Sequence, residues 1–366
     1  MSLSKITSIA TGVPAHKYLQ SDLFDFAEKA YTDSPDEARK LKFLYGHSGI
    51  SSRHSVLPDF TMLPEERSFF KGEGETATAP AIEARMEIFN RYAAPLSVET
   101  IDRCIEGNIS RSEITHLITV SCTGMSAPGL DLQIMELMEL PETIMRTSVN
   151  FMGCYAAIHG MKIADAFCKS TPNANVIVVC TEFCSLHFQQ TKSIDNLTSS
   201  LIFADGCAAM LMQSSPVKKG LIIENFYSRV LPKGKKDMAW ELSPTGFLMT
   251  LSSYIPDLIK ADFEILVKNA LSHTRKTKAD IDHWCIHPGG KKILQSISEA
   301  LDLKDNALDS SYEVLNDYGN MSSPTILFVL KKIIEDIKDS PEKRSNVFGA
   351  AFGPGLTMET FTASYG

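Results

Sequence analysis

Three side chains of the sequence, Cys154, His287 and Asn320, could together make a nucleophilic site. Cys154 follows Gly153 and precedes a predicted helix, YAAIHGMK. A thiol at a helix N-terminus feels the positive end of the helix dipole, and a neighbouring imidazolium lowers its pKa further. We therefore expect Cys154 to be a thiolate nucleophile at neutral pH. The alternative is a small buried apolar residue, as most free cysteines are.

His287 could be the base that assists this nucleophile. It ends an apolar strand, HWCIH, and is followed by a proline and by Gly289 and Gly290, which cannot continue a sheet. The turn exposes the imidazole and lets the backbone approach a ligand closely. His159, about one helical turn beyond Cys154, is the weaker candidate, because we expect it to pack into the fold.

Asn320 is a candidate because of an internal repeat in the sequence. The motifs NFMGC (150–154) and NDYGN (316–320) each read Asn, two residues, Gly and a polar residue before a predicted helix. Predicted strands end at Ser121 and His287, equally far upstream of the two motifs. If the two halves pack about a pseudo-twofold axis, the thiol, the imidazole and the carboxamide converge. Asn320 could then donate an N–H to an oxyanion, or it could cap the following helix.

The elements that must position these residues alternate between strands and helices. Runs of β-branched residues predict strands at Thr115–Ser121, Val176–Thr181, Cys207–Gln213, Leu221–Phe226 and Ile281–His287. One-sided apolar spacing predicts helices through Ile259, Phe263, Leu266 and Ala270, and through Ile326, Val329, Ile333 and Ile337. This alternation predicts an α/β fold with a largely covered sheet. The turn-rich stretch SSPVKKG (214–220) suggests a boundary between an N-terminal half, 1–217, and a C-terminal half, 218–366.

Composition narrows the class of protein. The 366 residues are 44% hydrophobic and 22% charged, which suffices for a sizeable core. The formal net charge of −8 argues against a nucleic-acid partner. Eight cysteines without paired spacing predict no disulfide framework. We see no signal peptide and no apolar run of the ~20 residues that a membrane span needs, and expect a reduced, cytoplasmic protein.

Motifs for other chemistry are missing from the sequence. It contains no GxxxxGK[ST] loop, no HExxH and no dinucleotide-binding fingerprint. Cys285 and His287 could form half of a metal site, but no second pair has ligand spacing, so we expect no metal.

Four strings in this order and spacing resemble the type III polyketide synthases, the chalcone synthase-like family, in its bacterial type: VNFMGCYAAIHG, HWCIHPGGKKIL, LNDYGNMSSPTILFVL and FGPGLTMET. The resemblance covers nearly the whole chain. It implies a thiolase fold with two pseudo-duplicated halves in a five-layered αβαβα core, and a homodimer. It also implies acyl-CoA and malonyl-CoA as substrates, with no cofactor.

The resemblance assigns roles to the reactive residues. Cys154 would accept an acyl starter from coenzyme A as a thioester. His287 would sustain the thiolate and, with Asn320, bind the thioester carbonyl of malonyl-CoA while decarboxylation places negative charge on it. The resulting carbanion would attack the Cys154 thioester. Phe203 matches the gatekeeper phenylalanine between the active site and the CoA tunnel, although core packing would also explain it.

Residues that shape the pocket depart from the plant pattern. Met249 replaces a phenylalanine in the second gatekeeper position, and Cys184 and His187 fall where the family lines its pocket with small polar residues. The cyclisation loop, Gly353, Pro354 and Gly355 after Phe352, follows an alanine rather than a glycine.

The predicted CoA-binding cluster is thinned. Lys40 matches it, but Phe43 and His47 replace basic residues. Lys292, just beyond Gly289 and Gly290, could compensate by meeting a CoA phosphate.

These departures favour a fatty acyl starter, leading to alkylpyrones or alkylresorcinols, over a coumaroyl starter leading to a chalcone. One rival is a ketoacyl-ACP synthase III, which usually has HQAN where this chain has HPGG. A cysteine-dependent thioester hydrolase is another, because Cys, His and Asn also suit acyl transfer to water. An inactive acyl-CoA-binding relative conflicts with the intact triad.

Overall fold

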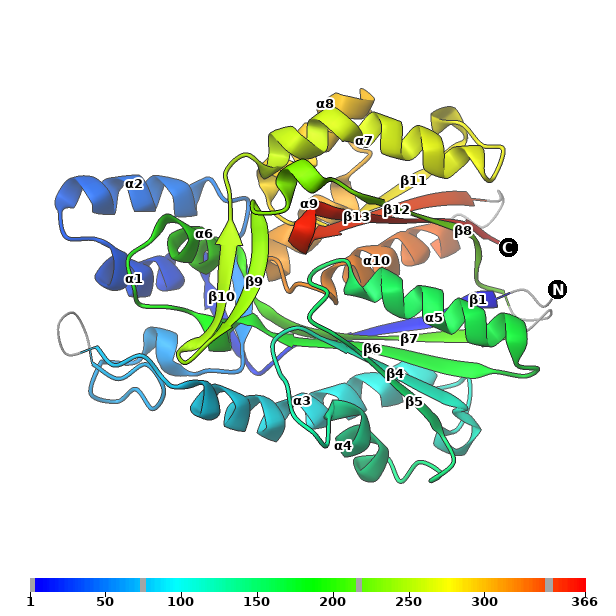
Figure 1. Ribbon diagram of the computed structural model, residues 1–366, viewed down its shortest axis with the longest axis horizontal. Coiled ribbons are helices and arrows are strands. Elements are labelled where there is room, and N and C mark those ends of the chain that lie inside the picture. The colour runs from blue at the N-terminus through cyan, green and yellow to red at the C-terminus, as the bar shows by residue number, and fades with distance from the viewer. Residues whose placement is uncertain (1–3, 73–76, 215–218, 340–344) are drawn as a thin grey trace.

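The computed structural model describes residues 4–72, 77–214, 219–339 and 345–366. Helices and sheets alternate in five layers (Figure 1). From one face to the other, the helices are α3 (Ile82–Ile105) and α4 (Leu130–Leu137), then α5 (Ala156–Ser170) and α10 (Thr325–Asp339), then α7 (Ile255–Ser272) and α8 (Lys291–Leu301). A sheet fills each gap between these pairs. The predicted αβαβα core is confirmed.

The two sheets join edge to edge. The first holds β1 (Ser4–Gly12), β4 (His116–Ser121), β5 (Met145–Asn150), β6 (Asn175–Phe183) and β7 (Asp205–Ser214). The second holds β8 (Leu221–Val230), β11 (His283–Ile286), β12 (Ser345–Gly353) and β13 (Thr357–Tyr365). In the described parts of the chain the strand order is β11-β12-β13-β8-β1-β7-β6-β4-β5. The junction is short, because β1 pairs with β8 only at Lys5 with Ile222 and Ile6 with Leu221.

Burial on both faces explains the composition of the strands. Strand β6 reads NVIVVCTEF, and every residue after Asn175 is buried. Helix α3 covers one face of this sheet and α5 covers the other, so a continuous apolar run replaces the usual alternation.

The helical faces predicted from the sequence are confirmed. In α7, Ile259, Phe263 and Leu266 are fully buried while the opposite face meets solvent. Helix α10 is buried more widely, because it lies between the two sheets: Leu327 and Leu330 are as inaccessible as the predicted face.

The internal repeat corresponds to two equivalent structural units. Strand β4, helix α5 and strand β6 form one unit, and β11, α10 and β12 form the other. In both units the two strands are parallel neighbours. The predicted boundary between the halves, at 217/218, lies outside the described residues and stays a prediction.

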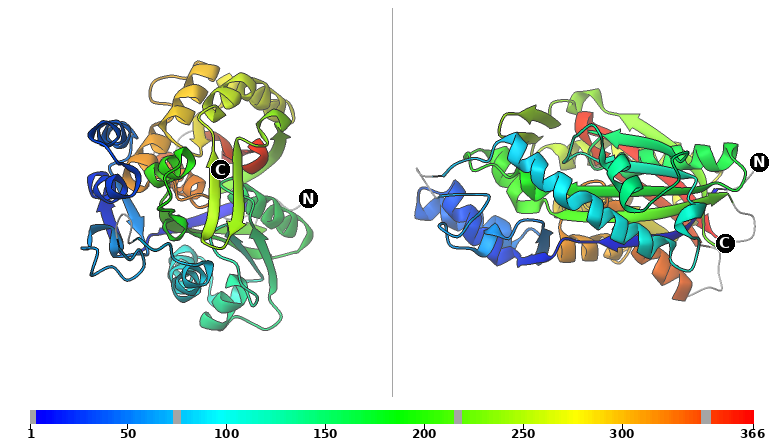
Figure 2. Two further views of the ribbon diagram at one scale, coloured as in Figure 1. Left: turned by 60° about the vertical axis from the view of Figure 1, so that its left-hand side comes forward. Right: turned by 90° about the horizontal axis from the view of Figure 1, so that it is seen from below.

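The elements outside the core gather at one end, away from the chain termini (Figure 2). They are β2 (His16–Leu19), α1 (Gln20–Tyr31), α2 (Pro35–Gly46), β3 (Ser52–Ser55), α6 (Ile194–Ile202), β9 (Met238–Ser243), β10 (Gly246–Leu251) and α9 (Asp309–Tyr318). Short 3₁₀ turns are η1 (Asp59–Thr61), η3 (Arg111–Glu113), η4 (Cys184–His187), η5 (Pro232–Gly234), η6 (Lys278–Asp280) and η7 (Pro354–Leu356). Within the described residues, none of the helices has the length and hydrophobicity that crossing a membrane requires.

Replacing Leu327 by alanine tests the central layer. Leu327 is fully buried in α10, so its loss leaves a cavity between the sheets and should lower the free energy of unfolding by about 2–5 kcal/mol. The matched control is Leu63→Ala, because Leu63 is 58% exposed; its effect should stay within about 0.5 kcal/mol. Urea denaturation of both variants measures the difference, and equal effects would contradict the assignment of α10 to the core.

Candidate active site

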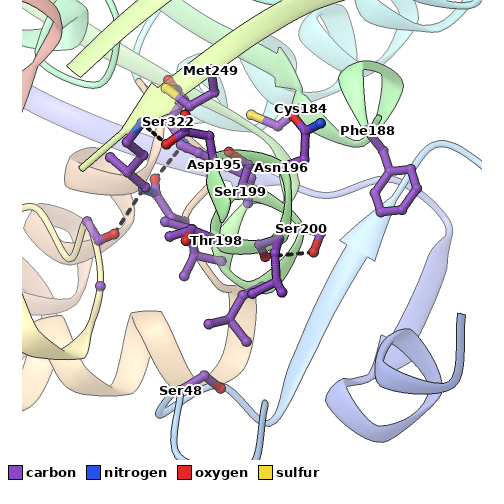
Figure 3. A pocket seen from close by; sticks show the side chains of 18 of the residues that line it. Ser48, Cys184, Phe188, Asp195, Asn196, Thr198, Ser199, Ser200, Met249 and Ser322 are labelled. Carbon is purple, nitrogen blue, oxygen red and sulfur yellow. Dashed lines mark hydrogen bonds between the residues drawn. The ribbon is translucent and has the colours of Figure 1, made fainter. Parts of the chain in front are cut away.

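A cavity of about 790 Å³ opens at the end of the molecule where α1, α2, α6 and the β9–β10 hairpin gather. Of the residues predicted from the sequence, those that line it are Cys154, His287, Asn320, Phe203, Met249, Cys184, His187, Lys292, Gly289, Gly290 and Pro354. Figure 3 shows Met249 and Cys184 toward one end, Ser48 toward the other and the side chains of α6 between them. The structure therefore brings residues from both halves to one space.

Cys154 lies two residues before α5, at the end of the helix where the backbone N–H groups are free. Gly153 makes this position possible: its φ is +81°, and a Cβ there would overlap the ring of Pro354. Gly153 N–H also donates to Cys122 Sγ, at 3.0 Å. The predicted cyclisation loop thus packs directly against the residue that presents the thiol.

His287 is a buried imidazole without a protein partner. It follows β11, it is 1% exposed, and neither ring nitrogen has a hydrogen-bond partner among the described residues. Its backbone is fixed, because His287 N–H donates to Ala350 O and Gly289 N–H donates to His287 O. Buried polar atoms are normally paired, so an unpaired imidazole on a cavity indicates a ligand-binding group.

The side-chain amide of Asn320 has a fixed orientation. Ser322 N–H donates to Asn320 Oδ1 at 2.9 Å, while the Nδ2 end has a long contact, 3.4 Å, with Gly289 O and a hydrogen bond with Cys154. The amide N–H group is therefore the end available to the cavity. Asn320 does not cap α10, which begins five residues later at Thr325. Its alternative reading as a helix cap is wrong.

Burial sets the charge states of Cys154 and His287. Desolvation raises the pKa of Cys154 to about 11, and the nearby Glu182 carboxylate adds to it, although hydrogen bonding from Ser322 and Asn320 opposes the shift. Desolvation also lowers the pKa of His287 to about 3. The expectation of a lowered thiol pKa is wrong for this state, because removal from water outweighs the helix dipole. At neutral pH Cys154 is therefore a thiol and His287 a neutral imidazole, and both line the cavity.

Glu182, which the sequence analysis missed, joins the two halves beneath the site. Its Oε2 accepts from Thr123 Oγ1 (2.8 Å) and Cys122 N–H (2.9 Å), and its Oε1 accepts from Ser323 Oγ (2.6 Å). Burial raises the pKa of this carboxyl to about 7. The available signal was an acidic residue at the end of an otherwise apolar strand, NVIVVCTEF.

Cys184 and His187 both lie on η4, at the end of β6. His187 is locked in place: Thr123 O lies 2.7 Å from its Nε2, and Phe247 N–H donates to its Nδ1 at 3.0 Å. The ring stacks on that of Phe247, with 4.2 Å between centroids. Burial lowers the pKa of His187 to about 3. His187 is therefore a rigid, uncharged part of the wall.

Met249 belongs to the β9–β10 hairpin, which lines the cavity and packs beside α6. Leu251 N–H donates to Asp195 Oδ1 at 3.1 Å and ties the hairpin to the start of α6. Trp240 Nε1–H donates to Cys122 O at 2.8 Å from the other strand of the hairpin.

His159, the weaker candidate for the base, contacts Glu359 on β13 (Nε2 to Oε1, 3.1 Å).

The mouth of the cavity carries part of the predicted CoA cluster. Gly289, Gly290 and Lys292 line it at the N-terminus of α8. Lys40 does not line the cavity within the described residues, but it shares a face of α2 with Phe43, which does. In the predicted cyclisation loop, Pro354 lines the cavity, whereas the neighbouring Gly353 and Gly355 do not. The described part of the chain holds no cluster of residues suited to a metal.

Two family models together cover almost the whole chain. Residues 2–216 match the N-terminal domain of chalcone and stilbene synthases, and residues 223–364 match their C-terminal domain. The chain belongs to the chalcone and stilbene synthase family, the type III polyketide synthases. It is therefore an acyltransferase that works by decarboxylative condensation.

Individual relatives of this type III polyketide synthase agree in sequence and in structure. The chain is 30% identical, over 98% of its length and 90% of the relative's, to the "alpha-pyrone synthesis polyketide synthase-like Pks18" of Mycobacterium tuberculosis. The structure of PKS-I from the brown alga Ectocarpus siliculosus superposes with a TM-score of 0.91 at 27% identity, over 100% and 99% of the two chains. Tetrahydroxynaphthalene synthase from Streptomyces coelicolor gives 0.87 at 26% identity, over 99% of each.

The charge state of the site predicts how Cys154 reacts with pH. Because only the thiolate is alkylated and the pKa of Cys154 is about 11, the rate of modification by iodoacetamide should still be rising at pH 10. Loss of the Ser322 hydrogen bond in Ser322→Ala should raise that pKa further and slow the reaction at a given pH. Peptide mass spectrometry at Cys154 measures both, and a plateau below pH 8 would contradict the prediction.

Proposed function

We propose that the chain loads an acyl group from coenzyme A onto Cys154, extends it with malonyl-CoA and cyclises the product. The observation that carries this proposal is the unpaired imidazole of His287 on the cavity that Cys154 and Asn320 also line. As Cys154 Sγ attacks the thioester carbon, His287 accepts the thiol proton and coenzyme A leaves as its thiol. The free N–H groups at the start of α5 stabilise the developing thiolate.

The same groups serve the second substrate. The N–H of His287 and the amide N–H of Asn320 hold the malonyl thioester oxygen, which gains negative charge as CO₂ departs. The carbanion then attacks the Cys154 thioester carbonyl and lengthens the chain by two carbons. Phe203 offers an apolar surface beside the malonyl carboxylate and so favours its loss as neutral CO₂.

Coenzyme A is assigned to the mouth of the cavity. The N-terminus of α8 offers backbone N–H groups and the positive end of its dipole to a phosphate. Lys292 adds a charge there, and the absence of side chains at Gly289 and Gly290 lets the thioester arm pass close to the backbone. Lys40 contributes a further positive charge from α2. No cofactor takes part in this scheme.

A fatty acyl starter fits the walls best, and we assign alkylpyrone or alkylresorcinol-like products. Phe26, Phe60 and Phe188 give the cavity apolar surface beyond Cys184, and burial of apolar surface favours a hydrocarbon chain. Met249 can adapt to such a chain. The relative Pks18 is named for α-pyrone synthesis, which supports the same class of product. Gly353, Pro354 and Gly355 shape the space in which the ring closes.

We also propose a homodimer of two-halved subunits, divided near 217/218, in the cytoplasm. All eight cysteines are free and buried, which suits a reducing compartment.

Incubation of the purified protein with malonyl-CoA and a panel of fatty and aromatic acyl-CoAs tests the proposal. We expect CO₂ release and alkylpyrones or alkylresorcinols from the fatty starters, without any carrier protein. Mass spectrometry identifies the products. Strict dependence on malonyl-ACP would support a ketoacyl synthase instead, and free acid as the sole product would support a thioester hydrolase. A marked preference for coumaroyl-CoA would refute the fatty starter.

Substitutions separate the two half-reactions. Cys154→Ala should abolish the acyl-enzyme detected by intact-protein mass spectrometry. Asn320→Ala should leave acylation of Cys154 intact but slow malonyl-CoA decarboxylation by about 10²–10³-fold, because a donor to the developing oxyanion is lost. Asn316→Ala is the control, because Asn316 is a half-buried asparagine of the same segment that does not line the cavity within the described residues. Unchanged CO₂ release in Asn320→Ala would remove Asn320 from the oxyanion role.

A further inference from the structure

Arg53, in the short strand β3, is a buried cation at the edge of the cavity. Its side chain reaches the C-terminal end of α6: Nη1 donates to Ser200 O at 2.7 Å and to Phe203 O at 2.6 Å. Nε donates to Gln20 Oε1 at 3.0 Å. Arg53 is 5% exposed and lines the cavity. Among the described residues it forms no ion pair with a carboxylate.

The contacts of Arg53 satisfy carbonyl groups that a helix end leaves unpaired. Helix α6 ends at Ile202, and Phe203 is its C-cap. The last carbonyls of a helix have no partner inside the helix and carry the negative end of its dipole. Gln20 Nε2 donates to the carbonyl of Leu201, at 2.9 Å, between the two that Arg53 binds. The side chains of Arg53 and Gln20 therefore fix the end of α6 and the backbone of Phe203.

The same arginine also packs against the segment that carries Asn320. Phe203 and Asn320 form an isolated β-bridge, in which Asn320 N–H donates to Ile202 O and Ala204 N–H donates to Asn320 O, both at 2.9 Å. A Cβ on Gly319, whose φ is +70°, would lie 2.8 Å from Arg53 Cγ. Gly319 is thus required for this close approach, and Arg53 contacts Phe203 of the bridge and the residue that precedes Asn320.

A cation in this place is costly. Desolvation lowers the pKa of Arg53, and a buried charge without an opposite charge is destabilising unless hydrogen bonds compensate. An apolar residue would fill the same volume without that cost. The planar guanidinium, however, can bind two carbonyls in a fixed geometry, which a lysine cannot do.

We propose that Arg53 is a positioning residue for decarboxylation: it sets the Phe203 ring and the Asn320 amide at the spacing that the malonyl thioester requires. The inference rests on the proposed function of Phe203 and Asn320. Arg53 hydrogen-bonds to neither Cys154 nor α5 in the described structure, and Asn320 reaches the thiol by a single hydrogen bond, so the loading of the starter depends on Arg53 much less than decarboxylation does.

The test measures the two half-reactions separately in Arg53→Met and Arg53→Lys. We expect Arg53→Met to acylate Cys154 within about twofold of the wild-type rate, and to release CO₂ from malonyl-CoA about tenfold more slowly or worse, because small misplacements are costly in catalysis. Arg53→Lys keeps the charge and one carbonyl contact, and should recover part of the loss. Rates are normalised to folded protein by circular dichroism.

Arg85→Met is the matched control. Arg85 is also buried and also binds backbone carbonyls, those of Pro80, Leu186 and Phe188, but in the described structure it forms no hydrogen bond with Phe203 or Asn320. It should lower both half-reactions by one common factor.

Parallel loss of both rates in Arg53→Met, or unchanged CO₂ release, overturns the inference. If Arg53→Met does not fold, Gln20→Met, which removes the acceptor of Arg53 Nε and the donor to Leu201 O but leaves the guanidinium in place, must give the selective loss instead. If the wild-type protein fails to decarboxylate malonyl-CoA, the proposed function is refuted. If the wild type releases CO₂ and Arg53→Met releases it at the same rate, only the role of Arg53 is refuted.

Discussion

Removal of water from the junction of the two halves is the constraint on which the chemistry depends. Burial holds Cys154 as a thiol and His287 as a neutral imidazole, with pKa values of about 11 and about 3. The thiolate of Cys154 and the imidazolium of His287 therefore have to form when the substrate binds, not before. The same dry surroundings strengthen each hydrogen bond and dipole aimed at the reacting atoms, so that one amide and one helix end can carry much of the stabilisation.

Such a junction needs cross-links that keep it from shifting. The Glu182 carboxylate ties the ends of β4 and β6 to Ser323 of the other half. The bridge between Phe203 and Asn320 adds backbone hydrogen bonds across the same boundary. Farther along α5, buried Glu359 of β13 contacts His159 and Lys162. Cys154 and Asn320, the proposed nucleophile and oxyanion donor, are thus held on a scaffold with little freedom to move apart.

Specificity is built from different elements than the chemistry. The proposed reactive residues lie at the ends of core strands and helices, whereas α6, α1 and the β9–β10 hairpin supply cavity walls to which we assign the acyl chain. Peripheral elements can vary without disturbing the core. Met249 and the stacked pair of His187 and Phe247 belong to these walls of the cavity. Membership of the family therefore does not decide which starter the protein uses.

The sequence by itself determined the alternation of the main core strands and helices, the repeat that pairs Cys154 with Asn320, and the family, because periodicity and motif spacing are local properties of the chain. The sequence also identified His287 as a candidate site residue, because the turn that follows it is encoded by the neighbouring proline and glycines. Only the tertiary structure decided the direction of the thiol pKa, the locked and neutral state of His187, and the parts played by Glu182 and Arg53. Each of these depends on burial and on hydrogen-bond partners far away in the chain, and no local pattern encodes them.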